Sequence, residues 1–384
     1  MSFKLFFGSL FLWICIYPIQ VFPDSKINLA QKFDIKAAWE KLLNTYAEYP
    51  NDSLSNQSVL AIQDFKDEIK KLVLEYTHNA PADHAFNPKK LEKTLNNIIG
   101  LKSKNLKKGS LKSHQEEVRF EVGITNDQLL QIKYTMDIPC GTDSILFIFE
   151  PDEQHWQEVL MWESSDYTNS SGSLNALQYV TSPKTKEGTW YILGTDTPAR
   201  CSSCWGAQRF YILQPIIGDI HPNVLFHRTE TSYQCNEKAE LKARENYFDF
   251  HFDGRSIQAE TLIRPHQYRY TKKKDLFIRV QPVAKNSRDF IEEWIMSSWD
   301  EASQWCASPL CEEFKAMHQI LHNPRLHEQN FQFESAKKIH GGHDRVDQIS
   351  LSNYLDSKEK LSWNFLVKYN GAHNFTLLSI NQVT

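Results

Sequence analysis

The spacing of apolar residues changes several times along this 384-residue chain, and these changes limit the folds it can adopt. Residues 27–100 and 286–321 repeat apolar side chains every three or four positions, which is typical of amphipathic helices. Residues 116–285 and 331–380 contain runs that alternate apolar and polar side chains, which is typical of strands with one buried face. Because helical and strand segments are grouped along the chain, the pattern predicts an α+β protein.

The predicted fold has an N-terminal helical segment, a central antiparallel β sandwich-like domain and a C-terminal helix pair on an antiparallel sheet. Hydrophobic residues make up 41% of the chain, which is enough to build several cores and argues against global disorder. We expect five consecutive parts: a signal peptide at 1–22, a helical segment at 27–100, a Lys-rich linker at 101–113, an antiparallel β domain at 114–285 and an α+β domain at 286–384.

The first residues resemble a secretion leader in their composition. Lys4 precedes an apolar run at 5–14, Pro18 interrupts it, and a polar segment follows at 23–26. A charged start, an apolar centre and a polar exit predict a cleaved signal peptide and a secreted or periplasmic protein. An uncleaved anchor is the alternative, because an apolar stretch of about 17 residues approaches the length that spans a bilayer. We expect no transmembrane segment after cleavage.

Six cysteines lie beyond the leader, and an even number suits complete pairing in an oxidising compartment. We expect disulfides among Cys140, Cys201, Cys204, Cys235, Cys306 and Cys311, with a connectivity that the sequence leaves open. Cys201 and Cys204 also have the spacing of a redox dithiol, but turn residues precede the pair and a strand pattern follows it. A structural cross-link is therefore favoured over a thiol–disulfide enzyme.

Short polar motifs mark the expected ends of several elements. Asn87-Pro88 and Gly100 flank an apolar stretch and predict a helix between them. Asn370-Gly371 predicts a hairpin that joins the last two strands. Asp253-Gly254 predicts another hairpin turn. In the C-terminal helix pair, the second helix is expected to bury one apolar face, made of Phe314, Met317, Ile320 and Leu321.

One strand pattern carries the candidate catalytic residues. Phe248, Phe250 and Phe252 fall on one face of this strand, and Asp249, His251 and Asp253 fall on the other. Carboxylates beside an imidazole can orient a catalytic histidine or bind a divalent metal. A solvated strand face is the alternative, and a calcium loop is disfavoured because calcium prefers oxygen ligands to an imidazole. A cleft lined by this row would favour an enzyme.

A second candidate is a histidine pair near the C-terminus. His318 and His322 are four residues apart, so a helix would place them on one face, where they could chelate a transition metal. The intervening residues lack the glutamate of a zinc-hydrolase helix, and we expect no cofactor. The formal net charge is −4, which disfavours nucleic acid as a partner.

The chain carries no nucleophile elbow, phosphate-binding loop or dinucleotide fingerprint. We therefore expect a binding or envelope-associated protein. A secreted hydrolase that uses Asp and His residues is the main alternative, and a thiol–disulfide enzyme is a further one.

Overall fold

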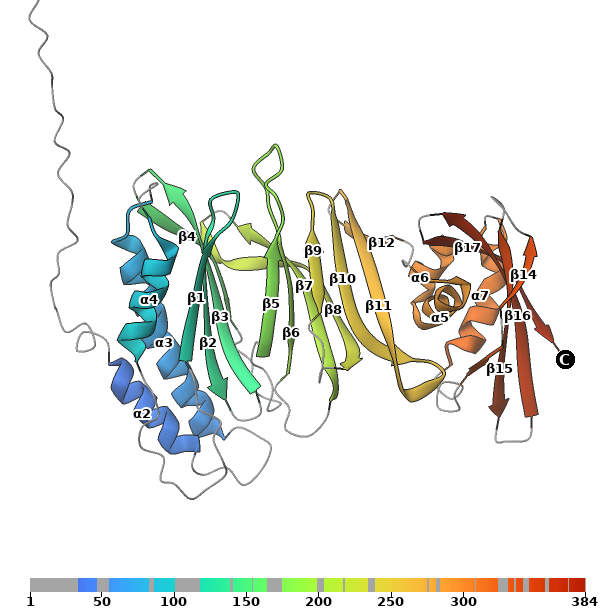
Figure 1. Cartoon of the computed structure of the whole chain (residues 1–384), viewed down its shortest axis with the longest axis horizontal. Coiled ribbons are helices and arrows are strands. Elements are labelled where there is room, and N and C mark those ends of the chain that lie inside the picture. The colour runs from blue at the N-terminus through green and yellow to red at the C-terminus, as the bar shows by residue number, and fades with distance from the viewer. Residues whose placement is uncertain are drawn as a thin grey trace, which may run out of the picture.

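The computed structural model describes residues 34–46, 55–82, 86–100, 118–138, 141–153, 155–163, 175–198, 204–216, 218–233, 239–274, 276–280, 284–307, 309–323, 331–334, 336–340, 345–355, 359–371 and 373–383. Helices and antiparallel sheets follow one another as layers along the long axis of the molecule (Figure 1). The predicted mixture of helices with antiparallel sheets is confirmed. No helix in the described ranges has the length and apolarity needed to cross a membrane.

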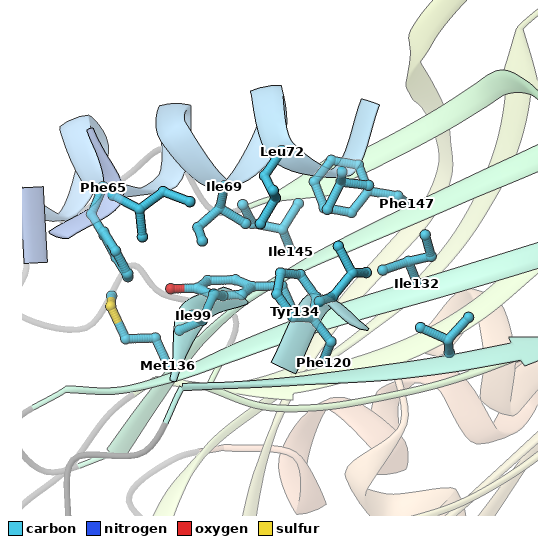
Figure 2. Packing of buried hydrophobic residues seen from close by; sticks show 14 of the residues in the cluster. Phe65, Ile69, Leu72, Ile99, Phe120, Ile132, Tyr134, Met136, Ile145 and Phe147 are labelled. Carbon is cyan, nitrogen blue, oxygen red and sulfur yellow. The ribbon is translucent and has the colours of Figure 1, made fainter. Parts of the chain in front are cut away.

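The N-terminal layer consists of three helices on one face of a four-stranded sheet. The helices are α2 (Ile35–Tyr46), α3 (Asn56–His78) and α4 (Pro88–Ile99), and the strands are β1 (Val118–Ile124), β2 (Leu130–Ile138), β3 (Gly141–Asp152) and β4 (His155–Glu163). Figure 2 shows Phe65 and Leu72 of α3 packed over Tyr134 of β2. Burial of these large side chains, at about 1.5–3 kcal/mol each, holds the helices to the sheet.

The predicted limits of α4 are confirmed. The side chain of Asn87 accepts a hydrogen bond from the backbone N–H of Lys90 at 3.1 Å, and Pro88 is the first helical residue. Gly100 ends the helix in the left-handed region, at φ +37°, where glycine is favoured. Local capping chemistry therefore defines both ends of this helix.

The central layer is an eight-stranded antiparallel sheet. Its strands are β5 (Asn175–Thr181), β6 (Ile192–Thr197), β7 (Trp205–Ile216), β8 (Asp219–Tyr233), β9 (Glu240–Ala243), β10 (Tyr247–Ser256), β11 (Ala259–Lys273) and β12 (Leu276–Val280). The order is β12-β11-β10-β8-β7-β6-β5, and β9 pairs with β10. One apolar cluster joins it to the first sheet through Ile148, Trp162 and Ile192. A second cluster, which includes Phe210, Phe250 and Tyr270, lies within the central sheet itself.

The alternation predicted for β10 is confirmed, because Phe248, Phe250 and Phe252 are all buried in that second cluster. The predicted hairpin is confirmed, but its turn lies at Ile257-Gln258 and not at Asp253-Gly254, and the residues of the disfavoured calcium loop belong to the hairpin. Strand β10 continues through Asp253 and Gly254 to Ser256 and pairs with β11. Gly254 lies under the ring of His266, and a Cβ there would come within 2.6 Å of His266 Cδ2. The glycine permits this close approach.

The C-terminal layer places helices α5 (Ser287–Met296), α6 (Trp299–Ala302) and α7 (Cys311–Leu321), with a 3₁₀ turn at Ser303–Trp305, against a five-stranded sheet. The strands are β13 (Gln332–Phe333), β14 (Lys337–His340), β15 (Val346–Leu355), β16 (Glu359–Gly371) and β17 (Asn374–Val383). The hairpin between β16 and β17 is confirmed, but Gly371 pairs with Asn374, so its tip lies beyond Asn370-Gly371.

The predicted apolar face of α7 is partly wrong. Phe314 and Leu321 are buried as expected, whereas Ile320 is 45% exposed. His318 is buried in the same layer, with only 2% of its surface exposed. Its ring packs edge-on against Trp294 of α5. A polar residue therefore contributes to the inner face of this helix because an aromatic neighbour and backbone acceptors surround it.

Candidate functional site

A cleft of about 410 Å³ lies where the central sheet meets the C-terminal layer. Strands β9, β10 and β11 form one side, and the segment that enters α5 forms the other. Nine of its thirteen lining residues are ionisable. The lining residues are Glu240, His251, Phe252, Asp253, Arg264, Pro265, His266, Gln267, Ala284, Lys285, Asp289, Glu293 and His373. We call this space the acidic cleft, because its described lining holds four carboxylates and two permanent cations.

The structure separates the three residues of the predicted polar row. Asp249 is buried and does not line the acidic cleft. Its carboxylate accepts two hydrogen bonds from Arg269, from Nε at 2.6 Å and from Nη2 at 2.8 Å. His251 and Asp253 do line the cleft, and they are two steps apart along the strand, about 7 Å. Asp249 therefore pairs strand β10 with β11, while the other two side chains border the open space.

His251 is the most distinctive of these groups. Its Nε2 is buried and has no hydrogen-bond partner among the described residues. Burial lowers the pKa of His251, and the positive charge of Lys242 lowers it further. The imidazole is therefore neutral at pH 7. Glu240 of β9 and Gln267 of β11 are its neighbours across the two strand pairings.

The wall of the cleft is a buried ion network. Arg264 and His266 of β11 both contact the carboxylate of Glu293 on α5, and His266 Nδ1 lies 2.6 Å from Glu293 Oε1. Arg279 of β12 donates from Nη2 to the other oxygen, Glu293 Oε2, at 2.8 Å. Burial alone would raise the pKa of Glu293, but Arg264 and His266 hold it well below its usual value. The carboxylate is therefore ionised, and its partners are cationic and imidazole side chains of the protein.

The groups at the rim are more accessible. Lys285 and His373 are exposed, and Asp289 is half-buried in the first turn of α5. Glu240 is 70% exposed and lies 3.7 Å from Lys242. Together with Asp253, the rim offers carboxylates on both sides of the opening. Such a rim favours hydroxyl or amino groups over anions, because like charges repel.

The predicted histidine pair lies elsewhere, on the inner side of α7. His318 Nε2 lies 3.1 Å from the carbonyl oxygen of Trp294, and His322 Nδ1 lies 2.8 Å from that of Ile295. Both acceptors belong to the last turn of α5, whose carbonyls lack helical partners. Burial, with a smaller contribution from His322, lowers the pKa of His318 to about 4. Within the described residues, no group of three or more His, Cys, Asp or Glu side chains is arranged to hold a metal.

The structure describes three of the six predicted disulfide cysteines. Cys306 and Cys311 are bonded to each other across the corner between the 3₁₀ turn and α7, with Cα atoms 5.4 Å apart. Cys204 is also disulfide-bonded. Cys140, Cys201 and Cys235 lie outside the described residues, as do the leader and the Lys-rich linker.

The residues of the buried network were missed in the sequence. Arg264 and His266 flank a proline within β11, and Glu292 and Glu293 stand directly beside the apolar residues of α5. Two adjacent glutamates that are both buried on a short helix need cationic partners. That requirement is a usable signal, but the sequence does not show which strand supplies the arginines.

No family model and no curated protein sequence matches the chain. Solved structures do match parts of it. These include an α-L-arabinanase from Penicillium chrysogenum complexed with arabinobiose (7% identity, TM-score 0.27, covering 68% of this chain and 65% of that one) and a mutant α-L-arabinofuranosidase from Fusarium graminearum with an iminosugar inhibitor (8%, 0.29, 70% and 66%).

A glycosyl hydrolase from Bacteroides ovatus is also similar (9% identity, TM-score 0.22, 67% and 63%). The chain spans slightly less than two thirds of the length of each of these proteins. At these TM-scores the similarity supports no argument about function.

Proposed function

We propose that this protein is an extracytoplasmic binding protein whose acidic cleft holds a small polar ligand rich in hydroxyl or amino groups. The observation that carries the proposal is the buried Nε2 of His251, which has no partner among the described residues, in a cleft lined by nine described ionisable side chains. A buried polar atom without a partner destabilises the protein. A ligand that forms a hydrogen bond with this atom removes that cost, which makes the binding free energy more favourable. A volume of about 410 Å³ lies in the range of small-molecule sites.

The proposed location rests on the leader and on disulfide chemistry. The Cys306–Cys311 bond is of the kind that persists in oxidising compartments. The leader composition agrees with export. Secretion or periplasmic residence therefore remains the location that we propose.

The second candidate is a hydrolase that uses the same cleft. A neutral imidazole can accept a proton from water or from a hydroxyl group through a ring nitrogen that has no partner within the described part of the chain, and Asp253 lines the same cleft. His251 would serve as the general base and Asp253 would position the substrate. This candidate is favoured by the presence of His251 and Asp253 in a cleft rather than on an open strand face. The thiol–disulfide alternative stays a prediction, because Cys201 lies outside the described residues.

The test compares binding with turnover. Calorimetry of the whole chain with neutral sugars, amino sugars, polyamines and matched anionic sugars should show saturable binding of a hydroxyl- or amine-rich compound. His251→Gln and Asp253→Asn should each weaken it about tenfold, as expected for a hydrogen bond in a buried site. Asp152→Asn, at an exposed position on β3, is the control. Failure of every compound to bind, or equal affinity in all three variants, would contradict the proposal.

Product analysis separates the two candidates. If the bound compound is cleaved, His251→Gln should reduce the rate by about 10²–10⁴-fold, which is the usual contribution of a general base. Binding without any cleavage, at every pH between 5 and 9, would leave the binding function and exclude this hydrolase for the compound tested.

A further inference from the structure

A second cleft, of about 330 Å³, lies along the same junction near the other end of β11. Thr271 and Lys273 of β11, Arg279 of β12, Gln304 and Trp305 of the 3₁₀ turn, and Thr376 of β17 contribute polar groups to it. We call it the basic cleft, because among the described residues two cations and no carboxylates line it. It therefore differs in charge from the acidic cleft, although the same layers enclose both.

Two buried donors at the basic cleft have no acceptor among the described residues. Arg279 is 3% exposed, and its Nε has no hydrogen-bond partner there, although its two terminal nitrogens bind Glu293, Glu301 and Ser297. Trp305 is also 3% exposed, and its Nε1 likewise has no partner. Both atoms can only donate. A ligand that satisfies them must bring acceptor oxygens.

The remaining groups have the same preference. Lys273 is exposed and forms no ion pair with any carboxylate in the described ranges. Thr376 accepts a hydrogen bond from Asn370 at 2.7 Å, which leaves its own hydroxyl proton free to donate into the cleft. The side-chain amide of Gln304 donates one N–H to the carbonyl oxygen of Asp300 at 2.9 Å, which leaves its second N–H to donate to a ligand. Donors and positive charge therefore converge on one space.

From this geometry we propose that the basic cleft binds a small oxyanion, either a carboxylate or a tetrahedral phosphate or sulfate group. Lys273 supplies the charge at the mouth, and Arg279 with Trp305 supplies the buried donors. The site is independent of the ligand proposed for the acidic cleft, so either proposal can fail without the other.

The experiment uses the whole chain and three inorganic or simple probes: phosphate, sulfate and acetate, each as the sodium salt against sodium chloride. Calorimetric titration at low ionic strength limits charge screening. We expect saturable binding of at least one probe with a Kd of about 1 mM, in the range of a few hydrogen bonds. Binding of phosphate and sulfate alone would indicate a tetrahedral group, and binding of acetate alone would indicate a carboxylate.

Matched variants assign the binding to this cleft. Lys273→Gln should weaken it about fivefold through the loss of one charge-assisted contact. Lys274→Gln removes the same charge from the next exposed residue, which does not line the cleft, and should leave the affinity within about twofold, since it contributes only at long range. Trp305→Phe replaces the indole with a phenyl ring, which keeps an aromatic side chain but removes the Nε1 proton, and should also weaken binding.

Two results would overturn the proposal. One is the absence of saturable binding of all three probes up to about 10 mM, beyond which general ion effects dominate. The other is equal affinity in the wild-type protein and in Lys273→Gln. Because Lys273 is exposed, this second result is available even if Trp305→Phe does not fold.

Discussion

The acidic and basic clefts differ in charge although one buried ion pair separates them. Glu293 lines the acidic cleft, Arg279 lines the basic cleft, and Arg279 Nη2 donates to Glu293 Oε2 at 2.8 Å. Strand β11 contributes to both, from Arg264 at one end to Thr271 about 23 Å further along. The comparison shows that the charge of a cleft depends on which member of a shared pair faces it.

The buried ion network between the central sheet and the C-terminal layer is better suited to fix how these two layers are aligned than to add stability. Arg228, Arg264 and Arg279 from the central sheet meet Glu292, Glu293 and Glu301 from the C-terminal layer. Removing charges from water costs several kcal/mol per ion, and the attraction between them approximately offsets that cost. Removing one partner is different, because it leaves the others buried and unpaired.

The largest expected effect comes from Glu293, since it lines the acidic cleft and binds Arg279, which lines the basic cleft. Glu293→Gln leaves Arg264 and Arg279 without their common carboxylate and should destabilise the protein by about 3–5 kcal/mol. Denaturant unfolding measures this loss, and Glu240→Gln, at an exposed carboxylate of the same cleft, should change stability by less than about 0.5 kcal/mol. Similar losses in the two variants would show that the network does not hold the clefts in place.

The same variant gives a pH signature. The folded pKa of Glu293 lies well below 4.5, so its contribution to stability is present above pH 4.5 and is lost as the pH falls toward the folded pKa. Wild-type stability should therefore fall in acid, and Glu293→Gln should show a smaller fall. Unfolding curves between pH 3 and 7 provide the measurement. A parallel pH dependence in both proteins would assign the acid loss to other groups.

A smaller effect is expected at Gly254, and it should concern the acidic cleft alone. Gly254→Ala places a Cβ 2.6 Å from His266 Cδ2 and 2.8 Å from Nε2, so the ring must shift, and this shift disturbs its contact with Glu293. Overpacking of this kind costs about 1–3 kcal/mol. Gly123→Ala, on β1, is the matched control, because no atom lies within 4 Å of the added Cβ. Equal melting temperatures in the two variants would refute the tight contact.

The smallest effect is expected from the Cys306–Cys311 bond, and it should concern the basic cleft. The bond closes a loop with a sequence separation of only 5, so replacing both cysteines by serine should cost at most about 2 kcal/mol. Cys306 lines the basic cleft next to Trp305. Oxyanion affinity should therefore fall, while ligand binding in the acidic cleft should not change. Calorimetric titration of both ligands checks this, and a loss in both clefts would show that they are not separable.

The sequence predicted helices and strands well where the buried residues recur with the period of a helix or a strand. Phe248, Phe250 and Phe252 identified the buried face of β10, and Asn87 and Gly100 identified the ends of α4. The prediction failed where a tertiary contact determines which residue type a position needs. Gly254 suggested a turn because glycine favours turns, yet its role is to admit the His266 ring from a neighbouring strand.

The candidate site was predictable only in part for the same reason. The polar face of β10 named His251 and Asp253, but Asp249 on the same face is paired with Arg269, which lies twenty residues away. Glu293 and its arginines come from three elements, and no spacing along the chain brings them together. The clefts form between layers, so their lining depends on how the layers pack. The periodicity of helices and strands indicates which faces are buried, but not which layer each face packs against.

The joint between the central sheet and the C-terminal layer also has a thermal consequence. The apolar clusters lie largely within the layers on either side of this joint, whereas hydrogen-bonded charges link α5 to β11 and β12. Exposure of apolar surface raises the heat capacity on unfolding, and exposure of polar surface lowers it. Opening the joint would thus change the heat capacity much less than melting either layer, so its free energy should vary almost linearly with temperature, whereas the stability of each core follows a curve.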